Sequence, residues 1–327
     1  MVIAVDAAGG DYFPKNPVQG AVEAIAERQD LTVLLAGPED LIRKELDNYS
    51  YDTARIRILH APEVIGMEES PSTAVKSKQQ SSIVLGLTAQ KRDYCKAFVS
   101  SGNTGALMAA SMFILGKLEG VQRPTIAATF PTMKGPRLLM DAGANLELKP
   151  EVYIQFAQMG TVYCREIIGT DNPCVGLINV GEEPEKGTDL LKEVNRQLSN
   201  LTNFRGNVEG GDLFAGTADI FLCNGLIGNI LLKFGESIPS TIQQMLAKTM
   251  AEMDLDRASR DLILNVIQAS LRNFNYEHIG GIPFLGVNGI SMVGHGGSSP
   301  TAIKNMIFNA VHCIEAEINE KIVESLR

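Results

Sequence analysis

The chain has 327 residues, of which 45% are hydrophobic and 20% charged, so it can bury a sizeable core and is expected to be globular. The formal net charge of −9 argues against general nucleic-acid binding, and any phosphate or acidic partner must meet a locally basic surface. The five cysteines show no CxxC pair and no metal-ligand spacing, which is typical of reduced thiols in a cytoplasmic protein.

The amino terminus predicts a strand at residues 2–5 that ends in the motif Asp6-Ala-Ala-Gly-Gly-Asp11. Ligands gather at such strand ends in open parallel sheets. Asp6 and Asp11 could therefore bind a metal, orient a base or cap the turn, and capping is the commonest of these roles. The spacing of Gly9 and Gly10 does not match the dinucleotide fingerprint GxGxxG. No basic segment of a signal peptide precedes the strand, so a cytoplasmic location is expected.

The next segments alternate between helix and strand. Hydrophobic spacing predicts helices at residues 17–28 and 38–46 and strands at residues 31–36 and 56–59. Another helix begins after Ser70, with Pro71 at its first position, and carries Lys76 and Lys78. Such lysines are usually a solvated face, but in this acidic chain they also form its most concentrated basic surface, together with Lys91 and Arg92.

Residues 95–115 predict a strand, a glycine-rich turn and a helix in immediate succession. The turn contains Ser101, Gly102, Asn103 and Thr104, and it precedes an apolar run. A strand-to-helix turn of this kind points backbone N–H groups and the positive end of the helix dipole at one spot, which suits phosphate. An ordinary turn capped by Asn103 or Thr104 is the alternative. The turn would leave backbone groups unpaired in lipid, so the uncharged span 97–116 is not a membrane helix.

Further predicted strands also end in glycine and polar residues. Strands at residues 125–130 and 136–140 precede Asp141-Ala-Gly-Ala-Asn145, and a helix follows at residues 150–168. A strand at residues 174–180 leads into a loop that contains Lys186, and a strand at residues 218–223 leads into Asn224-Gly-Leu-Ile-Gly-Asn229. Strands at residues 283–287 and 290–293 precede His295 and the final helix.

A long helical pattern runs from the Asn229 region to about residue 273. Apolar residues keep helical spacing there, for example Ile242, Met245 and Leu262. The charges of this stretch are balanced rather than basic, so a subunit interface is favoured over a membrane-surface helix.

Alternating strands and helices indicate an α/β fold with a mostly parallel sheet and helices on both faces. Repeated polar glycine turns at one end of the sheet predict a single cleft there. We find no linker or internal repeat, so residues 1–327 are interpreted as a single domain with a helical projection near residues 235–280.

The motifs described above, in this order, resemble the bacterial phosphate acyltransferases of phospholipid synthesis nearly from end to end. Each motif is weak alone, and their number and order make the resemblance specific. The motifs that carry it are Asp6 to Asp11, Ser101-Gly-Asn-Thr-Gly-Ala106, Arg123-Pro124, Asp141 to Asn145, Lys149-Pro150-Glu151, residues 155–160, Asn179-Val-Gly181, Lys186-Gly187, Gly206-Asn-Val-Glu209 and His295-Gly296.

The resemblance implies an enzyme that makes acyl phosphate from a long-chain acyl carrier protein thioester and orthophosphate. It also implies a fold like isocitrate dehydrogenase and phosphotransacetylase, a homodimer, and loose association with the inner face of the membrane. There the product would pass to a membrane glycerol-3-phosphate acyltransferase. Neither a metal nor a cofactor is implied.

For the site, we expect Ser101, Gly102, Asn103 and Thr104 to cradle phosphate, with Gly9 and Gly10 beside them. Lys186 would supply the countercharge or protonate the leaving thiol, and Asn229 and His295 would contact the oxyanion or the leaving group. The supporting residues are Asp6, Asp11, Asp141 and Asn145, and the acidic carrier protein would dock on Lys76 and Lys78. Cys223 lies in an apolar run and is interpreted as a buried, inert thiol.

The chain departs from the family pattern at three places. Ala8 and Tyr12 replace a methionine and a frequent histidine, the polar run after His295-Gly296 is altered to Gly297-Ser-Ser-Pro300, and Asn224 replaces an aspartate. The loss of that carboxylate keeps a non-catalytic phosphate- or acyl-binding protein open as an alternative. A dehydrogenase of the isocitrate type is the other alternative, but it would need a compact aspartate pair with basic clamps, which is not evident.

Overall fold

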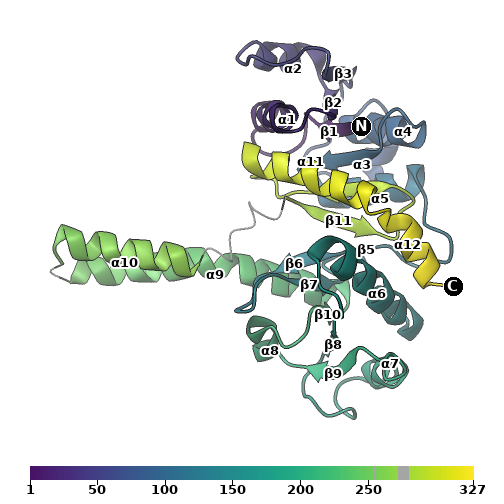
Figure 1. Cartoon of the computed structure of the whole chain (residues 1–327), viewed down its shortest axis with the longest axis vertical. Helices are drawn as coiled ribbons and strands as arrows, with labels where there is room; N and C mark the ends of the chain where they lie inside the picture. Colours follow the sequence, from purple (N-terminus) through teal and green to yellow (C-terminus); the bar gives the residue numbers. More distant parts are fainter. Residues whose placement is uncertain (254, 272–279) are drawn as a thin grey trace.

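Two β-sheets organise the chain, and most of their strands run parallel (Figure 1). The structure is a computed structural model that describes residues 1–253, 255–271 and 280–327. Within these residues, seven strands form the first sheet in the order β3 (Ile56–His60), β2 (Thr32–Gly37), β1 (Val2–Asp6), β4 (Ala97–Ser100), β12 (Ile290–Val293), β11 (Ile282–Leu285) and β5 (Thr125–Ile126). The second sheet has the order β6 (Ala128–Phe130), β7 (Arg137–Met140), β10 (Ile220–Leu222), β8 (Val175–Ile178) and β9 (Phe204–Val208).

Helices cover both faces of the first sheet, as the alternation of buried residues in β1 requires. Ile3 and Val5 belong to the cluster that includes the helices α1 and α11, whereas Ala4 belongs to the cluster that includes α4 and α5. The α-helices are α1 (Lys15–Glu27), α2 (Glu39–Leu46), α3 (Pro71–Ser77), α4 (Ser82–Lys91), α5 (Thr104–Ile114), α6 (Pro150–Tyr163), α7 (Asp189–Leu198), α8 (Gly210–Ala215), α9 (Gly225–Glu252), α10 (Arg257–Ser270), α11 (Pro300–Glu315) and α12 (Ile318–Ser325). A π-helical segment, Cys164–Ile168, continues α6. The predicted α/β class with a mostly parallel arrangement is confirmed.

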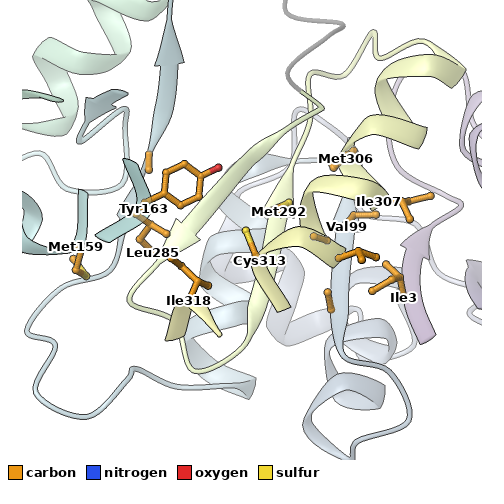
Figure 2. Packing of buried hydrophobic residues seen from close by; sticks show 14 of the residues in the cluster. Ile3, Val99, Met159, Tyr163, Leu285, Met292, Met306, Ile307, Cys313 and Ile318 are labelled. Carbon is orange, nitrogen blue, oxygen red and sulfur yellow. The ribbon is translucent and has the colours of Figure 1, made fainter. Parts of the chain in front are cut away.

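The largest hydrophobic cluster includes residues of both sheets. In Figure 2 the labelled side chains run from Met159 and Tyr163 of α6, past Leu285 of β11, to Val99 and Ile3 of the first sheet. A core that continues from one sheet to the other supports our proposal of a single domain.

The strand predicted at residues 125–130 is divided between the two sheets. Thr125 and Ile126 pair with β11 in the first sheet, whereas residues 128–130 pair with β7 in the second. The chain therefore passes from one sheet to the other at Ala127. A continuous apolar run does not reveal such a crossing, because both halves are buried.

The helix predicted after Ser70 is also divided. Lys78 leaves the helical region with φ −105° and ψ 69°, and Ser81 then caps α4 by accepting a hydrogen bond from the Val84 amide. The Lys78 ammonium is 2.5 Å from the Glu69 carboxylate and 2.7 Å from the Val64 carbonyl oxygen. These contacts hold the end of α3 against the loop that precedes it.

Helices α9 and α10 extend away from the two sheets (Figure 1). In α9 only glycines near its start are buried, and α10 has no buried residue. Part of the helical projection expected near residues 235–280 lies outside the described residues, namely 254 and 272–279. In the described part of the chain, no helix is long and apolar enough to cross a membrane.

Candidate active site

A cleft of about 540 Å³ lies between the two sheets. The first sheet and its helices line it with the start of α3, the first half of α5 and the ends of β11 and β12. The second sheet contributes the turn after β7 and the exposed face of α9. The polar lining residues are Ser72, Thr104, Asn229, Lys233, Glu236 and His295, together with backbone at Gly105, Gly143 and Gly294.

The amino terminus of α5 opens into this cleft at Thr104 and Gly105. Asn103 caps the helix, because its side-chain oxygen accepts a hydrogen bond from the Ala106 amide at 3.0 Å. The first amides of a helix have no carbonyl partner within the helix, so those of Thr104 and Gly105 remain available to an anion. A Cβ on Gly105 would lie 2.6 Å from the Pro71 ring, so glycine is needed for the close approach of α3.

The side chain of Asn103 is committed to the protein itself. Its amide nitrogen donates to the carbonyl oxygens of Gly66, Met67 and Glu69, each at 3.1 Å. With its oxygen on Ala106, both ends of the side chain are therefore used. Asn103 therefore positions the start of α5, and its side chain is not available to a ligand.

The cleft lining does not include Ser101, Gly102, Gly9 or Gly10. The Ser101 hydroxyl donates to the Gly9 carbonyl oxygen at 3.2 Å, and the Gly102 amide donates to the Ser100 hydroxyl at 3.0 Å. The carboxyl ends of β1 and β4 form the switch point of this sheet, where ligands usually bind. Here the bond from Ser101 to Gly9 joins the two loops, and within the turn the cleft lining begins at Thr104.

Asp6 is buried beneath the same two loops. The Ser100 hydroxyl donates to one of its carboxyl oxygens at 2.6 Å, and the Ala8 amide donates to the other at 3.1 Å. Burial raises the pKa of Asp6, and the hydrogen bond from Ser100 opposes this effect. We therefore assign Asp6 to holding the β1 and β4 loops together.

His295 lies at the end of β12 and lines the cleft. Its Nδ1 accepts a hydrogen bond from the Gly297 amide at 3.1 Å, so a neutral ring carries its proton on Nε2. The exposed Asp11 stands next to this turn, because its amide donates to the Gly296 carbonyl oxygen at 2.8 Å. The motif Asp6 to Asp11 after β1 therefore contacts the motif His295-Gly296 after β12.

Asp141 organises the turn after β7. One oxygen accepts from the amides of Ile126, Gly143 and Ala144 at 3.1–3.3 Å, and the other accepts from the Asn145 amide at 2.6 Å and its side chain at 2.9 Å. Burial raises the pKa of Asp141, and these donors act in the opposite direction. The turn places Gly143 and Ala144 on the cleft wall.

The glycines of Asn224-Gly-Leu-Ile-Gly-Asn229 fit α9 against this turn. The Gly225 amide donates to the Asn145 carbonyl oxygen at 2.7 Å, and a Cβ on Gly228 would overlap the Asp141 carbonyl oxygen. Asn229 then lies beside Gly143 and faces the cleft. The turn Asp141 to Asn145 after β7 and the segment Asn224 to Asn229 after β10 are therefore packed together.

Lys233 and Glu236 were missed by reasoning from the sequence. They follow Asn229 by four and seven residues, which places all three on one face of α9. This helical spacing, visible in the sequence, could have indicated that Lys233 and Glu236 lie on the same face as Asn229. Lys233 supplies a cation to the cleft wall.

Lys186 does not line the cleft among the described residues. It is exposed in the loop after β8, where its carbonyl oxygen accepts a hydrogen bond from the Asn179 side chain at 3.0 Å. Lys76 is exposed on α3, whose first residues line the cleft, and it has no ion pair within the described residues. The Lys78 ammonium forms an ion pair with the Glu69 carboxylate.

An apolar chamber of about 80 Å³ adjoins the cleft. The two share Leu232, Ile282, Val293 and His295, among others. The inner wall of the chamber comes from β6, α9 and the start of α11, including Thr129, Gly235, Ala302 and Met306. The cleft carries polar groups at Thr104, Asn229 and Lys233, and the adjoining chamber is mostly apolar. Together they suit a ligand with a polar head and a hydrocarbon chain.

Cys223 is buried, and its thiol contacts the Asp141 carbonyl oxygen at 3.6 Å. Burial raises the pKa of this thiol, which keeps it protonated and unreactive. In the described ranges, no group of three His, Cys, Asp or Glu residues is arranged to hold a metal ion.

Comparison with known proteins agrees with this geometry. A phosphotransacetylase from Streptococcus pyogenes superposes with a TM-score of 0.63 over 96% of this chain and 94% of that chain, at 15% identity, which shows a shared fold. The sequence profile of the family "Fatty acid synthesis protein" matches residues 1–321. Phosphate acyltransferases from Chlorobaculum parvum and Salinibacter ruber are each 48% identical to this chain. The alignments cover 100% and 94% of this chain and 99% and 92% of these relatives.

The chain has an α/β fold that it shares with a phosphotransacetylase, with a cleft between its two sheets. More narrowly, the chain belongs to the Fatty acid synthesis protein family. It is a phosphate acyltransferase, so the resemblance seen in the sequence is confirmed. Membership of this family supports an acyltransferase over both alternatives, which were a non-catalytic binding protein and a dehydrogenase of the isocitrate type.

Proposed function

We propose that this phosphate acyltransferase transfers a long-chain acyl group from an acyl carrier protein thioester to orthophosphate, and so supplies acyl phosphate for phospholipid synthesis. The observation that carries the proposal is the amino terminus of α5, which opens at Thr104 and Gly105 into a cleft shared with His295, Asn229 and an apolar chamber. One cleft thus offers donors for an anion beside space for a hydrocarbon chain.

Orthophosphate is the nucleophile, and the protein must hold it. The amides of Thr104 and Gly105 and the Thr104 hydroxyl donate hydrogen bonds to it, with the dipole of α5 behind them. Lys233 is our first candidate for the countercharge, because it lines the cleft. Lys186 is the second candidate, in the loop after β8. Holding the reactants in the attacking geometry contributes roughly 7–11 kcal/mol.

A phosphate oxygen attacks the thioester carbon, so a C–O bond forms and the carbonyl oxygen becomes an oxyanion. The side-chain amide of Asn229 and the Nε2–H of His295 are the candidate donors to that oxygen, and one such donor is worth about 3–4 kcal/mol. Collapse of the intermediate breaks the C–S bond, and the leaving thiolate takes up the proton that the attacking hydrogen phosphate gives up, so that acyl phosphate and free thiol are formed. Cys223 has no part in this direct route.

The apolar chamber beside His295 would hold the acyl carbons next to the thioester. At about 80 Å³ it takes a short stretch of chain, and the remainder would follow the wider cleft. Dimer formation and hand-off of the product to a glycerol-3-phosphate acyltransferase at the inner membrane face belong to the same proposal.

A kinetic comparison tests the phosphate site. Thr104→Val keeps the shape of the side chain but removes its hydroxyl, and hydrogen bonds to charged groups are worth about 1.5–3 kcal/mol. We expect the KM for orthophosphate to rise roughly tenfold or more, with an unchanged KM for the acyl donor. Thr53→Val, in the exposed turn before β3, is the matched control. An unchanged phosphate KM for Thr104→Val would remove the Thr104 hydroxyl from the proposed phosphate contacts.

A further inference from the structure

A second hollow, which we call the basic recess, adjoins the cleft at the far part of α5. Its volume is about 430 Å³, and it shares Met108 and Ala144 with the cleft wall. The remaining lining residues are Met112, Lys117, Gln122, Arg123, Pro124 and Asn145. Neither the proposed chemistry nor the phosphate site uses the two cations of this recess.

Lys117 and Arg123 give the recess its positive charge. Lys117 donates one hydrogen bond to the Gln122 carbonyl oxygen at 3.0 Å, and an ammonium group has three N–H donors. Within the described residues, neither cation has a carboxylate partner, and the neighbouring Glu119 pairs with Arg327 at 3.7 Å. In a chain of net charge −9, two such cations in one hollow favour an anionic ligand.

The loop that carries these cations is fixed to its surroundings. The Gln122 amide donates to the Gln155 side chain of α6 at 2.8 Å, and that side chain donates to the Gly120 carbonyl oxygen at 2.8 Å. The Asn145 side chain donates to the Pro124 carbonyl oxygen at 2.8 Å. The recess is therefore built into the turn after β7, which also forms the cleft wall.

The spacing along α5 separates the recess from the reacting phosphate. Thr104 lies in the cleft, Met108 lies on the shared wall, and Met112 lies in the recess. With a rise of 1.5 Å per residue, eight residues of helix place an anion in the recess on the order of 12 Å from the phosphate at Thr104. That distance is too long for the attacking group. It suits an anion at the far end of a flexible arm whose thioester lies in the cleft.

We infer that the basic recess binds the phosphate ester of the phosphopantetheine arm on which the acyl thioester is carried. This inference rests on the proposed function, because it assigns a place to the donor of that reaction. The Arg123 guanidinium can meet two phosphate oxygens at once, and Lys117 adds a second charge. The arm would then run beside Met108 into the cleft.

Two pairs of ligands test this inference on the full-length protein. Palmitoyl-phosphopantetheine and palmitoyl-pantetheine differ only in the phosphate. The second pair, phosphopantetheine and pantetheine, differs in the same way but carries no acyl group. For Arg123→Gln and for Lys117→Gln we expect the KM for the phosphorylated donor to rise about tenfold, with unchanged KM values for palmitoyl-pantetheine and orthophosphate. Arg92→Gln, an exposed arginine at the end of α4, is the control.

Calorimetric binding of unacylated phosphopantetheine measures the recess without catalysis. We expect it to bind the native protein more tightly than pantetheine does, and Arg123→Gln to abolish this difference. A wild-type protein that binds phosphopantetheine but forms no acyl phosphate would reject the proposed function and leave the recess supported.

Other results would overturn the assignment. Equal losses on both donors would mean that the phosphate of the arm is not the ligand. A raised orthophosphate KM would make the recess a site for free phosphate. A defect confined to the intact carrier protein would assign the cations to its acidic surface instead.

Discussion

Asn224 occupies the N-cap of α9, where its side-chain oxygen accepts a hydrogen bond from the Ile227 amide at 3.0 Å. Asparagine and aspartate cap helices about equally well, because each offers an oxygen in the same position. The carboxylate that relatives are expected to carry here is therefore not needed for this contact. The departure that raised doubt about catalysis fits a conservative exchange between two capping residues.

Two substitutions at Asn224 separate capping from catalysis. Asn224→Asp should keep turnover within about twofold of the native value, whereas Asn224→Ala should lower the free energy of unfolding by about 1 kcal/mol. Urea unfolding and the phosphate-dependent release of thiol measure the two quantities. If Asn224→Asp raised turnover tenfold or more, the missing carboxylate would have a chemical role and capping would not account for the position.

At the scale of the residue, the start of α5 could be predicted from the sequence, but the hydrogen bonds made by its individual side chains could not. Strand, turn and helix follow from the order of residues 95–115, so Thr104 could be placed at the start of a helix in advance. The three bonds from Asn103 to residues 66–69 arise from a loop more than thirty positions away. No local pattern reveals that a distant loop occupies a side chain.

At the scale of the element, α9 joins the turn after β7 to the cleft through close backbone contact. Gly228 allows this contact, since a Cβ there would overlap the Asp141 carbonyl oxygen and lie 3.0 Å from the Cys223 sulfur. Overpacking of this kind usually costs about 1–3 kcal/mol. The face of α9 that carries Asn229 and Lys233 depends on the same fit.

Gly228→Ala should therefore lower the free energy of unfolding by about 1–3 kcal/mol or more and also reduce turnover, because α9 must shift. Gly211→Ala is the matched control, since it lies in α8 with nothing within 4 Å of a new Cβ. There alanine should be neutral or stabilising by up to about 1 kcal/mol. Equal unfolding midpoints in urea for the two variants would show that the close approach does not constrain α9.

Sequence patterns predicted the helices and strands better than the sheet to which each strand belongs. Periodicity correctly predicted most helices and strands, and the polar glycine ends of β4, β7, β10 and β12 were visible in the sequence. The division of residues 125–130 between two sheets was not visible, because both halves are equally apolar. The place of Lys233 depends on that division, since the cleft lies between the sheets.

At the scale of the whole molecule, α9 and α10 leave apolar side chains uncovered. Met245 and Leu262 are each 65% exposed, and Val266 is 56% exposed. Helices with such side chains usually bury them against a partner. This supports our proposal that the projection forms the interface of a homodimer.

Sedimentation equilibrium tests this interface. We expect the native chain to sediment as a dimer and the double variant Met245→Lys with Leu262→Lys to sediment as a monomer, because charges at the centre of an apolar interface oppose association. Met133→Lys with Leu41→Lys, at exposed positions outside the projection, is the control and should remain dimeric. A dimeric Met245 and Leu262 variant would place the interface elsewhere.

The most direct test of the whole account is mass-spectrometric analysis of the product formed from purified protein, an acyl carrier protein thioester and orthophosphate. We predict acyl phosphate and free thiol in equal amounts, with no thiol release when orthophosphate is omitted. Free fatty acid formed at the same rate without orthophosphate, or no acyl phosphate at all, would contradict the assignment of the cleft to acyl transfer onto phosphate.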